Sequence, residues 1–586
     1  MNARKHARIA HHQRKQRAIC KLNKLLIITL LLIALFLWRI GPVSGATIYV
    51  PTQYSTIQAA VDAALSGDTI QVAAGTYYEQ ITINKTITII GENPKTTIVD
   101  GAQNGTVFYI EDSKNVRITG FTIRNAGSNY SAIIAEREIV GSDYHRIENN
   151  IITTSQYGIY FSASDYNKIY NNTITGNSLA GVYINSADNT NITSNIIDDS
   201  AYGIRVAASI NNKIVNNVIN LTSFGVHLTL ASTGNIIRQN TITGRAAGIY
   251  TTSDTTTIDH NTVTQSAYAI YLYNCLTNQV YYNTILDSSY GIRLYRTDIT
   301  SSTHNINNNK IVNTDWALEM VNAYGNTFTG NWLQENTYGV YMSSSSSNTF
   351  YRNNFVNNDM QAYTGTGTNS WNKTGNGNYW SDYKGIDENH NGIGDTPYTL
   401  IPVGRDNYPL MTTWSEHDVT ITSVTTSTNQ TNPGGIVIIT VKVRNNNNIS
   451  ATETFTVTTK YNNTAISTQQ VTNLAQGATQ ILTFAWNTTG VPTGNYTIKA
   501  EATTVTNELN TDNNNFTDGT VKINAPLIGD INGDGTINSE DLSLLTQAYG
   551  STLGDPNWNQ NADLNKDNNV NISDLNLLAQ NYGDSN

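Results

Sequence analysis

The feature that constrains this chain most is a short phrase that returns ten times between about Ile147 and Phe355. Each copy starts with an asparagine and carries an aliphatic or aromatic residue two positions later. The asparagines are Asn150, Asn172, Asn195, Asn217, Asn240, Asn261, Asn283, Asn309, Asn331 and Asn353. They stand 21 to 26 residues apart, and a fixed period of this size marks a solenoid. Three brief apolar pieces per period, without a helical 3.6-residue pattern, predict the coils of a parallel β-helix.

The asparagine column has a structural explanation. Side chains at one position of successive coils stack about 4.8 Å apart, and asparagine can both hydrogen-bond along such a stack and adopt a left-handed turn. We therefore expect the asparagines to form a ladder, with the isoleucines stacked in the interior.

A second column follows the Gly-Ile or Gly-Val pair of each period, and strand alternation should turn it outward. Its members are Tyr160, Tyr183, Arg205, His227, Tyr250, Tyr271, Arg293, Glu319 and Tyr341. Two interpretations stay open. The tyrosines Tyr160, Tyr183, Tyr250, Tyr271 and Tyr341 bind the flat faces of sugars, or the column only covers its sheet. Arg293 and Glu319 fall on adjacent coils, where we expect an ion pair.

The candidate catalytic residues are Asp198, Asp199, Arg205 and His227, the densest titratable cluster of the array. Paired carboxylates could serve as acid and base in glycoside hydrolysis, and an arginine could take a proton in a lyase reaction. The sequence lacks the Gly-His-Gly and Arg-x-Lys motifs of polygalacturonases and the clustered acids of a pectate lyase. We therefore expect a binding protein, with a polysaccharide lyase or glycoside hydrolase as the enzyme alternative.

The first 46 residues carry nine Lys or Arg, no acid, and an apolar run from Leu25 to Trp38 before the small residues Ser44-Gly-Ala46. This pattern predicts a secretory signal peptide cleaved after Ala46, with an uncleaved signal anchor as the open alternative. Without it, 25 of the 34 basic residues remain against 44 acids, a charge of −19. So acidic a secreted protein is not expected to bind nucleic acid, and it would meet a membrane only through an uncleaved N-terminal segment.

The residues around the repeats predict how the β-helix begins and where it is interrupted. Residues 56–65 form an amphipathic pattern, so we expect a short helix that caps the first coil. Two long periods predict protruding loops, one at residues 125–145 and one near Thr297–His304. Loops on a rigid scaffold often carry function.

The repeats resemble a known family. The Asn-Asn-x-Ile and Tyr-Gly-Ile-Tyr phrases, and the closing stretch "GNYWSDYKGIDENHNGIGDTPYTL", are similar to NosD-type repeats over roughly residues 47–411. The start, "GDTIQVAAGTYYE", resembles pectin-lyase-like β-helix proteins. The resemblance implies a right-handed parallel β-helix of the carbohydrate-binding and sugar-hydrolase group and a sugar-related setting, without fixing an activity. We find no Met/His/Cys set for copper.

Within the closing stretch, oxygen-bearing side chains recur around Gly392. Asp387, Asn389, Asn391 and Asp395 occupy positions 1, 3, 5 and 9 of an EF-type calcium loop, with glycine at 6. Tyr398 stands where the bidentate acid of position 12 is expected. A calcium site and an Asx-rich turn that simply ends the β-helix both remain open here.

After a linker at 412–417, residues 418–524 change to longer strands separated by turns such as Asn432-Pro-Gly-Gly435. This pattern predicts a β-sandwich. "NPGGIVIITVKVRNNN" and "LTFAWNTTGVPTGNYTIKAEA" resemble the CARDB module, an adhesion-associated sandwich. The segment shows no catalytic constellation, so we expect a spacer or binding module.

Residues 526–586 contain two copies of a calcium-loop pattern, 33 residues apart. The expected ligands are Asp530, Asn532, Asp534, Thr536, Asn538 and Asp541 in the first loop and Asp563, Asn565, Asp567, Asn569, Asn571 and Asp574 in the second. Each loop precedes one Leu-rich helix, which resembles a type I dockerin. The resemblance implies a small all-α module with two Ca²⁺ ions that binds a cohesin. It also implies recognition residues at loop positions 10 and 11, here Ser539, Glu540, Ile572 and Ser573.

Together these patterns predict a mainly β modular protein, secreted and associated with the cell surface. Its β-helix is expected to meet extracellular polysaccharide, and its dockerin to dock the chain to a cohesin-bearing scaffold or surface protein. The alternatives that stay open are a polysaccharide-degrading enzyme and a structural surface-layer or adhesion protein without a sugar ligand.

Overall fold

The computed structural model describes residues 45–137, 141–229, 231–297, 303–365 and 367–585, besides Lys21 and Thr29. The predicted signal segment therefore lies almost entirely outside the described residues, as do residues 298–302 of the second predicted loop. No described helix is long and apolar enough to cross a membrane. The chain is mainly β, with a right-handed β-solenoid of about 15 turns, as the sequence predicts. It divides into two compact parts, residues 1–257 and 258–586.

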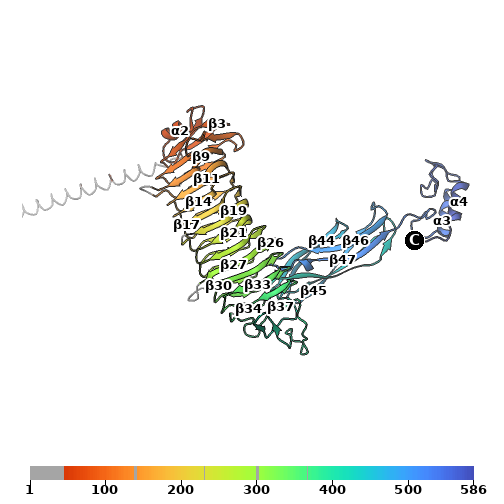
Figure 1. The fold of residues 1–586 in the computed structure, drawn as a ribbon. Helices are drawn as coiled ribbons and strands as arrows, with labels where there is room; N and C mark the ends of the chain where they lie inside the picture. The colour runs from red at the N-terminus through yellow and green to blue at the C-terminus, as the bar shows by residue number, and fades with distance from the viewer. Residues whose placement is uncertain are drawn as a thin grey trace, which may run out of the picture. The chain divides into compact units, whose positions relative to one another are not determined.

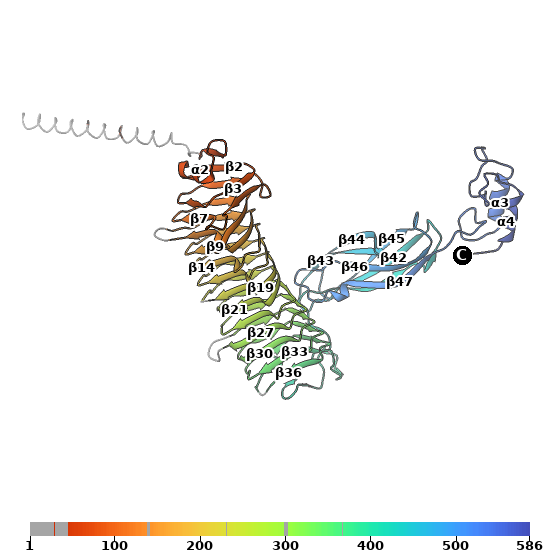
Figure 2. The ribbon, with the colours of Figure 1, turned by 45° about the horizontal axis from the view of Figure 1, so that its top comes forward.

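In the first part, each coil adds one short strand to a parallel sheet, and Figures 1 and 2 show these coils stacked behind the helix α2 (Ile57–Ala63). The strands of this sheet are, in order, β1 (Thr47–Val50), β2 (Thr69–Val72), β5 (Thr88–Gly91), β8 (Arg117–Thr119), β10 (Arg146–Glu148), β12 (Lys168–Tyr170), β15 (Asn191–Thr193), β18 (Lys213–Val215) and β20 (Ile236–Arg238). The remaining strands of the coils are β3 (Gly75–Tyr78), β4 (Ile81–Ile83), β6 (Thr97–Asp100), β7 (Phe108–Glu111), β9 (Thr122–Glu136), β11 (Ile151–Ser162), β13 (Thr173–Thr175), β14 (Ala180–Asn185), β16 (Ile196–Asp198), β17 (Tyr202–Ala207), β19 (Val218–Thr229) and β21 (Thr241–Thr251).

The second part begins with coils of the same kind. One sheet runs through β22 (Thr257–Asp259), β25 (Gln279–Tyr281), β28 (Asn305–Asn307), β31 (Thr327–Thr329) and β34 (Thr349–Tyr351). The other strands are β23 (Thr262–Thr264), β24 (Tyr268–Tyr273), β26 (Thr284–Leu286), β27 (Tyr290–Thr297), β29 (Lys310–Val312), β30 (Trp316–Ala323), β32 (Trp332–Gln334), β33 (Tyr338–Ser343), β35 (Asn354–Val356), β36 (Met360–Tyr363) and β37 (Tyr379–Trp380). A two-stranded pair, β38 (Tyr398–Thr399) and β39 (Arg405–Asp406), follows.

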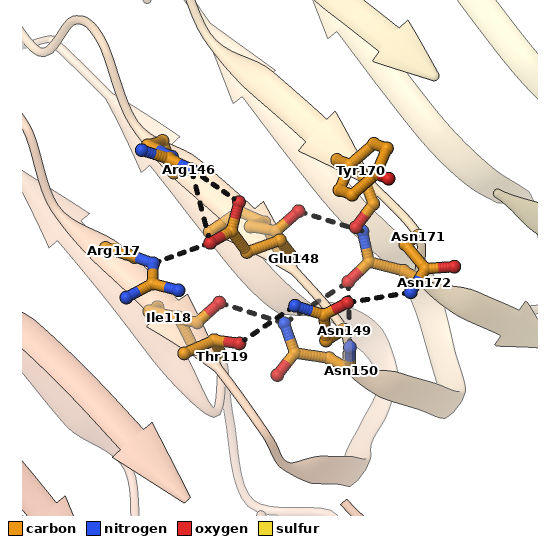
Figure 3. Close-up of polar contacts among 11 residues, drawn as sticks. Arg117, Ile118, Thr119, Arg146, Glu148, Asn149, Asn150, Tyr170, Asn171 and Asn172 are labelled. Carbon is orange, nitrogen blue, oxygen red and sulfur yellow. Dashed lines mark hydrogen bonds and ion pairs between the residues drawn. The ribbon is translucent and has the colours of Figure 1, made fainter. Parts of the chain in front are cut away.

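The asparagine ladder is present. The backbone N–H of Asn150 donates to Oδ1 of Asn172 over 3.0 Å, and Asn172 donates in the same way to Asn195 (Figure 3). In the second part the ladder ends at Asn378, whose N–H donates over 2.7 Å to Oδ2 of the fully buried Asp406. The left-handed residue is the one before each asparagine, such as Asn149 with φ 56°, so the ladder residue itself does not make the turn.

The interior is built by the apolar residue between two outward side chains of each short strand. Ile118, Ile147, Ile169, Ile192 and Ile214 stack in register and are fully buried. The first coil is covered by α2, whose N-cap Thr56 accepts from the N–H of Ala59 and which buries Ile57, Ala60 and Val61. This is the cap that the sequence predicts.

The prediction of a long loop at residues 125–145 is wrong for most of that range. Residues 122–136 form the single long strand β9, which pairs in parallel with β11 through two register shifts. The extra residues of this coil are thus absorbed as irregular strand. Of the described residues in the predicted loop, 137 and 141–145 belong to no helix or strand.

Residues 419–523 form two sheets around a common core that contains Phe484 and Trp486. The sheets are β40 (Val419–Thr426), β42 (Ile436–Asn445) and β45 (Thr479–Asn487), and β41 (Gln430–Thr431), β47 (Asn515–Ile523), β46 (Gly494–Ala502), β43 (Glu453–Tyr461) and β44 (Thr464–Leu474). A 3₁₀ turn, η1 (Asp512–Asn514), precedes β47. Strand β44 was not predicted, because its alternation is mostly polar: Val471 and Leu474 are its buried residues.

The C-terminal segment contains α3 (Ser539–Ala548) and α4 (Ile572–Gln580). Leu545 and Leu578 pack with Ile531, Ile537 and Val570 in a small core of their own. One helix therefore follows each of the two predicted calcium loops.

Candidate functional site

The outward column of the first part is a stack of half-buried side chains. Tyr160 and Tyr183 lie directly opposite each other on β11 and β14, with ring centroids 4.9 Å apart and planes inclined by 6°. Each ring therefore covers a face of its neighbour, and the stack offers mainly ring edges and hydroxyl groups outside. Sugar binding by these tyrosines remains a prediction. The geometry favours contacts through the hydroxyls over stacking of a sugar on an open face.

Arg205 and His227 continue this column on β17 and β19. The Arg205 guanidinium lies 5.0 Å from the Tyr183 ring and 5.2 Å from the Tyr202 ring. His227 stacks on Tyr202 and Phe224, each at 5.2 Å. Burial, and then the charge of Arg205, lowers the pKa of His227 to about 4. The imidazole is therefore neutral near pH 7.

The two aspartates of the candidate catalytic cluster lie elsewhere on the same coil. Asp198 ends β16, and Asp199 turns the chain with φ 51°. Within the described residues, no hydrogen bond or ion pair joins either aspartate to Arg205 or His227. Asp199 instead lines a groove of about 320 Å³ with Arg245. A catalytic role for the four residues remains a prediction, and it would require substrate to reach across the turn between β16 and β17.

The second part contains the ion pair expected between Arg293 and Glu319. Nε of Arg293 lies 2.5 Å from Oε2 of Glu319, and both side chains are largely buried. The guanidinium also lies 5.0 Å from the Tyr268 ring and 5.1 Å from the Tyr271 ring. Burial raises the pKa of the Glu319 carboxyl, and the nearby guanidinium opposes this. The pair is enclosed among aromatic rings, which explains both charges without a ligand.

A second aromatic column was missed. The aromatic residue just before the glycine or alanine of these coils stacks along them: Tyr290 on Trp316 at 4.6 Å, and Trp316 on Tyr338 at 6.2 Å. Beside it, the turns that connect the strands form a groove of about 600 Å³. The acids that line this groove are Asp287, Asp315, Glu335 and Asp359. The signal in the sequence is an aromatic residue followed by glycine or alanine at the same place in each of these coils.

The first C-terminal loop is organised by its own carboxylates. Asp530 accepts from the N–H groups of Asp534 and Gly535 at 3.1 and 2.9 Å, and Gly535 has φ 86°. Asp541, fully buried, accepts from Ile531 at 2.7 Å and from Asn538 at 3.0 Å. The second of these bonds completes a capping box at the start of α3.

The second loop repeats these contacts position by position. Asp563 accepts from Asp567 at 3.1 Å and from Asn568 at 2.8 Å, and Asn568 takes the left-handed turn with φ 65°. Asp574 accepts from Leu564 and Asn571, each at 2.8 Å. Asparagine therefore fills the glycine position without changing the loop.

The donor set of both loops is all oxygen, which suits a hard cation such as calcium. Each carboxylate oxygen that accepts one N–H keeps further lone pairs for an ion. Hydrogen bonds from Thr536 lower the pKa of the Asp534 carboxyl, and a bond from Asn565 does the same for Asp567. Across the described ranges, no group of three or more His, Cys, Asp or Glu side chains is close enough to hold a metal by itself. A calcium shell here would draw on amide and backbone carbonyl oxygens as well.

The stretch 387–395 shows the same local pattern. Asp387 accepts from Asn391 at 3.1 Å and from Gly392 at 2.8 Å, and Gly392 has φ 84°. Asp395 accepts from the N–H of Glu388 at 2.8 Å and from Nδ2 of Asn389 at 3.1 Å. The carboxylate that accepts from the second residue of the loop is thus at position 9 here, whereas it is at position 12 in the two C-terminal loops.

The four expected recognition residues lie in the first turns of the two helices. Ser539 and Glu540 begin α3, Ile572 and Ser573 begin α4, and all four are exposed. Ile572 is 55% exposed, which is unusual for an isoleucine beside a small core. The positions are open to a partner on both helices.

Three family models match separate parts of the chain. They are "Right handed beta helix region" at residues 106–263, "Periplasmic copper-binding protein (NosD)" at 297–385 and "Dockerin type I domain" at 528–581. The chain therefore combines β-helix, NosD and type I dockerin regions, as the resemblances imply. A type I dockerin implies a cohesin partner and calcium.

Known proteins match shares of very different size. The probable ABC transporter binding protein NosD of Stutzerimonas stutzeri is 44% identical over 57 residues, which cover 10% of this chain and 13% of that relative. The CARDB domain of a Pyrococcus furiosus protein is 26% identical and covers 19% of this chain and 93% of its own, with a TM-score of 0.17. A GH87 alpha-1,3-glucanase catalytic unit from Streptomyces thermodiastaticus is 16% identical and covers 59% of this chain and 71% of its own, with a TM-score of 0.40.

Proposed function

We propose that this chain is a secreted or cell-surface protein whose dockerin docks it, in a calcium-dependent way, to a cohesin-bearing scaffold or surface protein. Its β-helix would then meet extracellular polysaccharide. The observation that carries the proposal is the pair of C-terminal loops, whose first and last carboxylates make the same backbone contacts in both copies. Duplicated loops, each followed by one helix, agree with the dockerin model over residues 528–581.

In this proposal two calcium ions are held by the side chains of loop positions 1, 3, 5, 9 and 12, with a backbone carbonyl at position 7. When bound, calcium supplies the charge that offsets the repulsion among the carboxylates of each loop. Asp541 and Asp574 also cap α3 and α4, so they connect each loop to the helix that presents the recognition residues. Calcium binding and the order of the recognition surface should therefore be coupled.

The test is isothermal titration calorimetry of the full chain against a panel of type I cohesin modules, with calcium and with a chelator. We expect binding with calcium, and its loss in the chelator and in a variant with Asp530→Ala and Asp563→Ala. Asp584→Asn is the matched control, because Asp584 is exposed in the same module and lies outside both loops. Cohesin binding that persists in chelator would refute the calcium-dependent assignment.

We also propose a third calcium ion at residues 387–395, supported by the agreement of its contacts with those of the two C-terminal loops. In the variant with Asp530→Ala and Asp563→Ala, one calcium per chain should still bind, and adding Asp387→Ala should remove it. Calorimetric stoichiometry with calcium chloride reads this directly. If Asp387→Ala leaves the residual binding unchanged, the stretch is only an Asx-rich turn.

The polysaccharide part of the proposal draws on the long outward columns of tyrosine and polar side chains. Its test is affinity electrophoresis of the purified chain through gels that contain neutral or charged polysaccharides. Retardation that is lost when Tyr250 and Tyr271 become alanine would assign binding to the tyrosine column. A chain that no polysaccharide retards would favour a purely structural surface protein.

A further inference from the structure

A column of basic side chains runs along the first part. It lies on a sheet that carries none of the tyrosines discussed so far. Arg117, Arg146 and Lys168 lie directly opposite one another on β8, β10 and β12, and Lys213 follows on β18 after the neutral Asn191 of β15. We call these four side chains the basic stripe. Lys213 is exposed, and the Arg117 and Arg146 side chains are 35% and 52% exposed.

The two arginines are held in place from below. Glu148, whose side chain is 5% exposed, accepts from Nε of Arg117 at 2.6 Å and from Nη2 of Arg146 at 3.0 Å (Figure 3). The two arginines keep the pKa of the Glu148 carboxyl below its usual range, although burial acts in the opposite direction. One buried acid therefore fixes two guanidinium groups. Arg117 donates to Glu148 through Nε, and in the described part of the chain its Nη atoms form no hydrogen bond.

Aromatic and amide groups flank the stripe. Tyr170 is 37% exposed, and Nζ of Lys168 lies 4.5 Å from its ring. On one corner of the coils, Tyr144 and Tyr166 stack at 5.0 Å and are 47% and 52% exposed. On the other corner, Asn171 donates to Asn149 at 2.7 Å (Figure 3). Exposed rings, amides and cations on one sheet face provide the contacts that a charged sugar polymer uses.

The acids near the stripe match its four cations in number, so what matters is which cations are paired. Besides Glu148, the acids around it are Asp143, Asp165 and Asp188, one on each successive corner. Asp143 accepts from the N–H of Asp165, Asp165 from that of Asp188, and Asp188 from that of Ile210, and Lys114 lies 3.4 Å from Asp143. These aspartates accept from the backbone of the next coil and not from the stripe, whose Lys213 is exposed.

The stripe is also local. The matching positions on the second part's sheet are uncharged: Gln279, Asn305, Thr327 and Thr349. Without its first 46 residues the whole chain carries a charge of −19, from 25 basic and 44 acidic residues. Glu148 accounts for one charge of the two arginines, whereas Lys168 and Lys213 form no ion pair among the described residues and are available to an external anion.

We propose that the basic stripe binds an anionic polysaccharide, one that carries carboxylate or sulfate groups, along the sheet β8–β10–β12–β15–β18. This rests on the proposed polysaccharide binding by the β-helix and names its ligand class. Neighbouring coils place the cations about 4.8 Å apart, so an extended polymer that lies along the coils meets one cation after another. The fixed guanidinium forks suit bidentate contacts with carboxylate or sulfate.

The test uses the full chain in affinity electrophoresis and calorimetry with dextran sulfate, polygalacturonate and neutral dextran. Lys168→Gln with Lys213→Gln is the main variant, because neither lysine forms an ion pair with another described residue and the fold should not depend on them. Lys442→Gln on the exposed face of β42 is the matched control. We expect the double variant to bind dextran sulfate or polygalacturonate roughly two- to thirtyfold more weakly, since each exposed charge contact changes an affinity by about 1.4- to fivefold.

The outcomes separate this inference from the function on which it rests. Preference for dextran sulfate over dextran, weakened by salt and by the double variant alone, supports the stripe. Binding of polygalacturonate without dextran sulfate limits the ligand to carboxylated polymers. Equal loss in the Lys442→Gln control, binding of neutral dextran only, or equally tight binding of double-stranded DNA overturns the stripe as a polysaccharide site. Failure to bind any polysaccharide, neutral or charged, overturns the proposed function itself.

Discussion

Replacing Asn217 by alanine should destabilise the β-helix strongly, because this side chain connects three coils. Its Oδ1 accepts from the backbone N–H of Asn195 at 2.9 Å and from Nδ2 of Asn195 at 3.0 Å. Its Nδ2 donates to the carbonyl of Ile192 at 2.9 Å and to Oδ1 of Asn240 at 3.0 Å. The side chain is almost fully buried, so water cannot replace these bonds.

The magnitude follows from the groups left behind. The buried N–H of Asn195 loses its acceptor, which costs about 1–3 kcal/mol, and two or three further bonds are lost at about 1 kcal/mol each. We expect the free energy of local unfolding to fall by roughly 3–5 kcal/mol. Asn191→Ala is the control: Asn191 is exposed on β15, and such surface changes stay within about 0.5 kcal/mol.

A chain of several modules does not unfold in one step, so the measurement must be local. Hydrogen–deuterium exchange followed by mass spectrometry reports the opening free energy of β15, β18 and β20 separately from the sandwich and the dockerin. Exchange in these strands should accelerate in Asn217→Ala and remain unchanged in Asn191→Ala. If both variants exchange alike, the ladder contributes no stability, and the reasoning from buried donors is refuted.

Three further predictions concern the titratable groups. The pKa of His227 is lowered to about 4, so an unfolded histidine takes up a proton below about pH 6.5 while the folded one does not. Stability should therefore fall between about pH 6.5 and 4, and His227→Phe, which keeps an aromatic ring in the stack, should reduce this fall in calorimetric melting curves. The pKa of Glu148 is lowered, so its contribution to the stability of the fold is present above its unfolded pKa and is lost as the pH falls through its folded pKa. Glu148→Gln should remove that pH-dependent loss and loosen Arg117 and Arg146. If the β-helix is an enzyme, incubation with a polysaccharide panel should yield new reducing ends or unsaturated uronates that disappear in Asp199→Ala or Arg205→Ala. If no polymer yields a product, the enzyme alternative fails and the binding role is retained.

The sequence could predict those columns that every coil repeats. Asn150 and its successors, and the isoleucines from Ile118 to Ile214, must recur because each coil presents the next with the same donors and the same interior space. The two C-terminal loops with one helix after each could be located equally well, since each residue type is tied to a loop position, while calcium binding there stays a prediction. Arg293 and Glu319 could be paired from their register alone.

The features that could not be predicted from the sequence lie at the corners of the coils and in irregular strands. The period from Ile123 to Ile152 is too long, but whether the extra residues leave the sheet is decided by bulges, and β9 keeps them within it. The outward tyrosines were expected to be exposed, yet rings that repeat every coil must stack, as Tyr160 and Tyr183 do, and become half-buried. The distance of Asp199 from His227 also depends on a corner, which a linear period does not describe.

In a solenoid the repeat itself builds the rod, so a ligand site has to be sought where a column departs from its usual residue. The column of Arg117, Arg146 and Lys168 changes to asparagine at Asn191, and the equivalent positions of the second part are neutral. A requirement of the fold would recur in every coil, because every coil faces the same neighbours. Since charge does not recur in this column, the fold does not need it there. Glu148 accounts for the placement of Arg117 and Arg146, and the proposed anionic polymer is the reason offered for the unpaired Lys168 and Lys213.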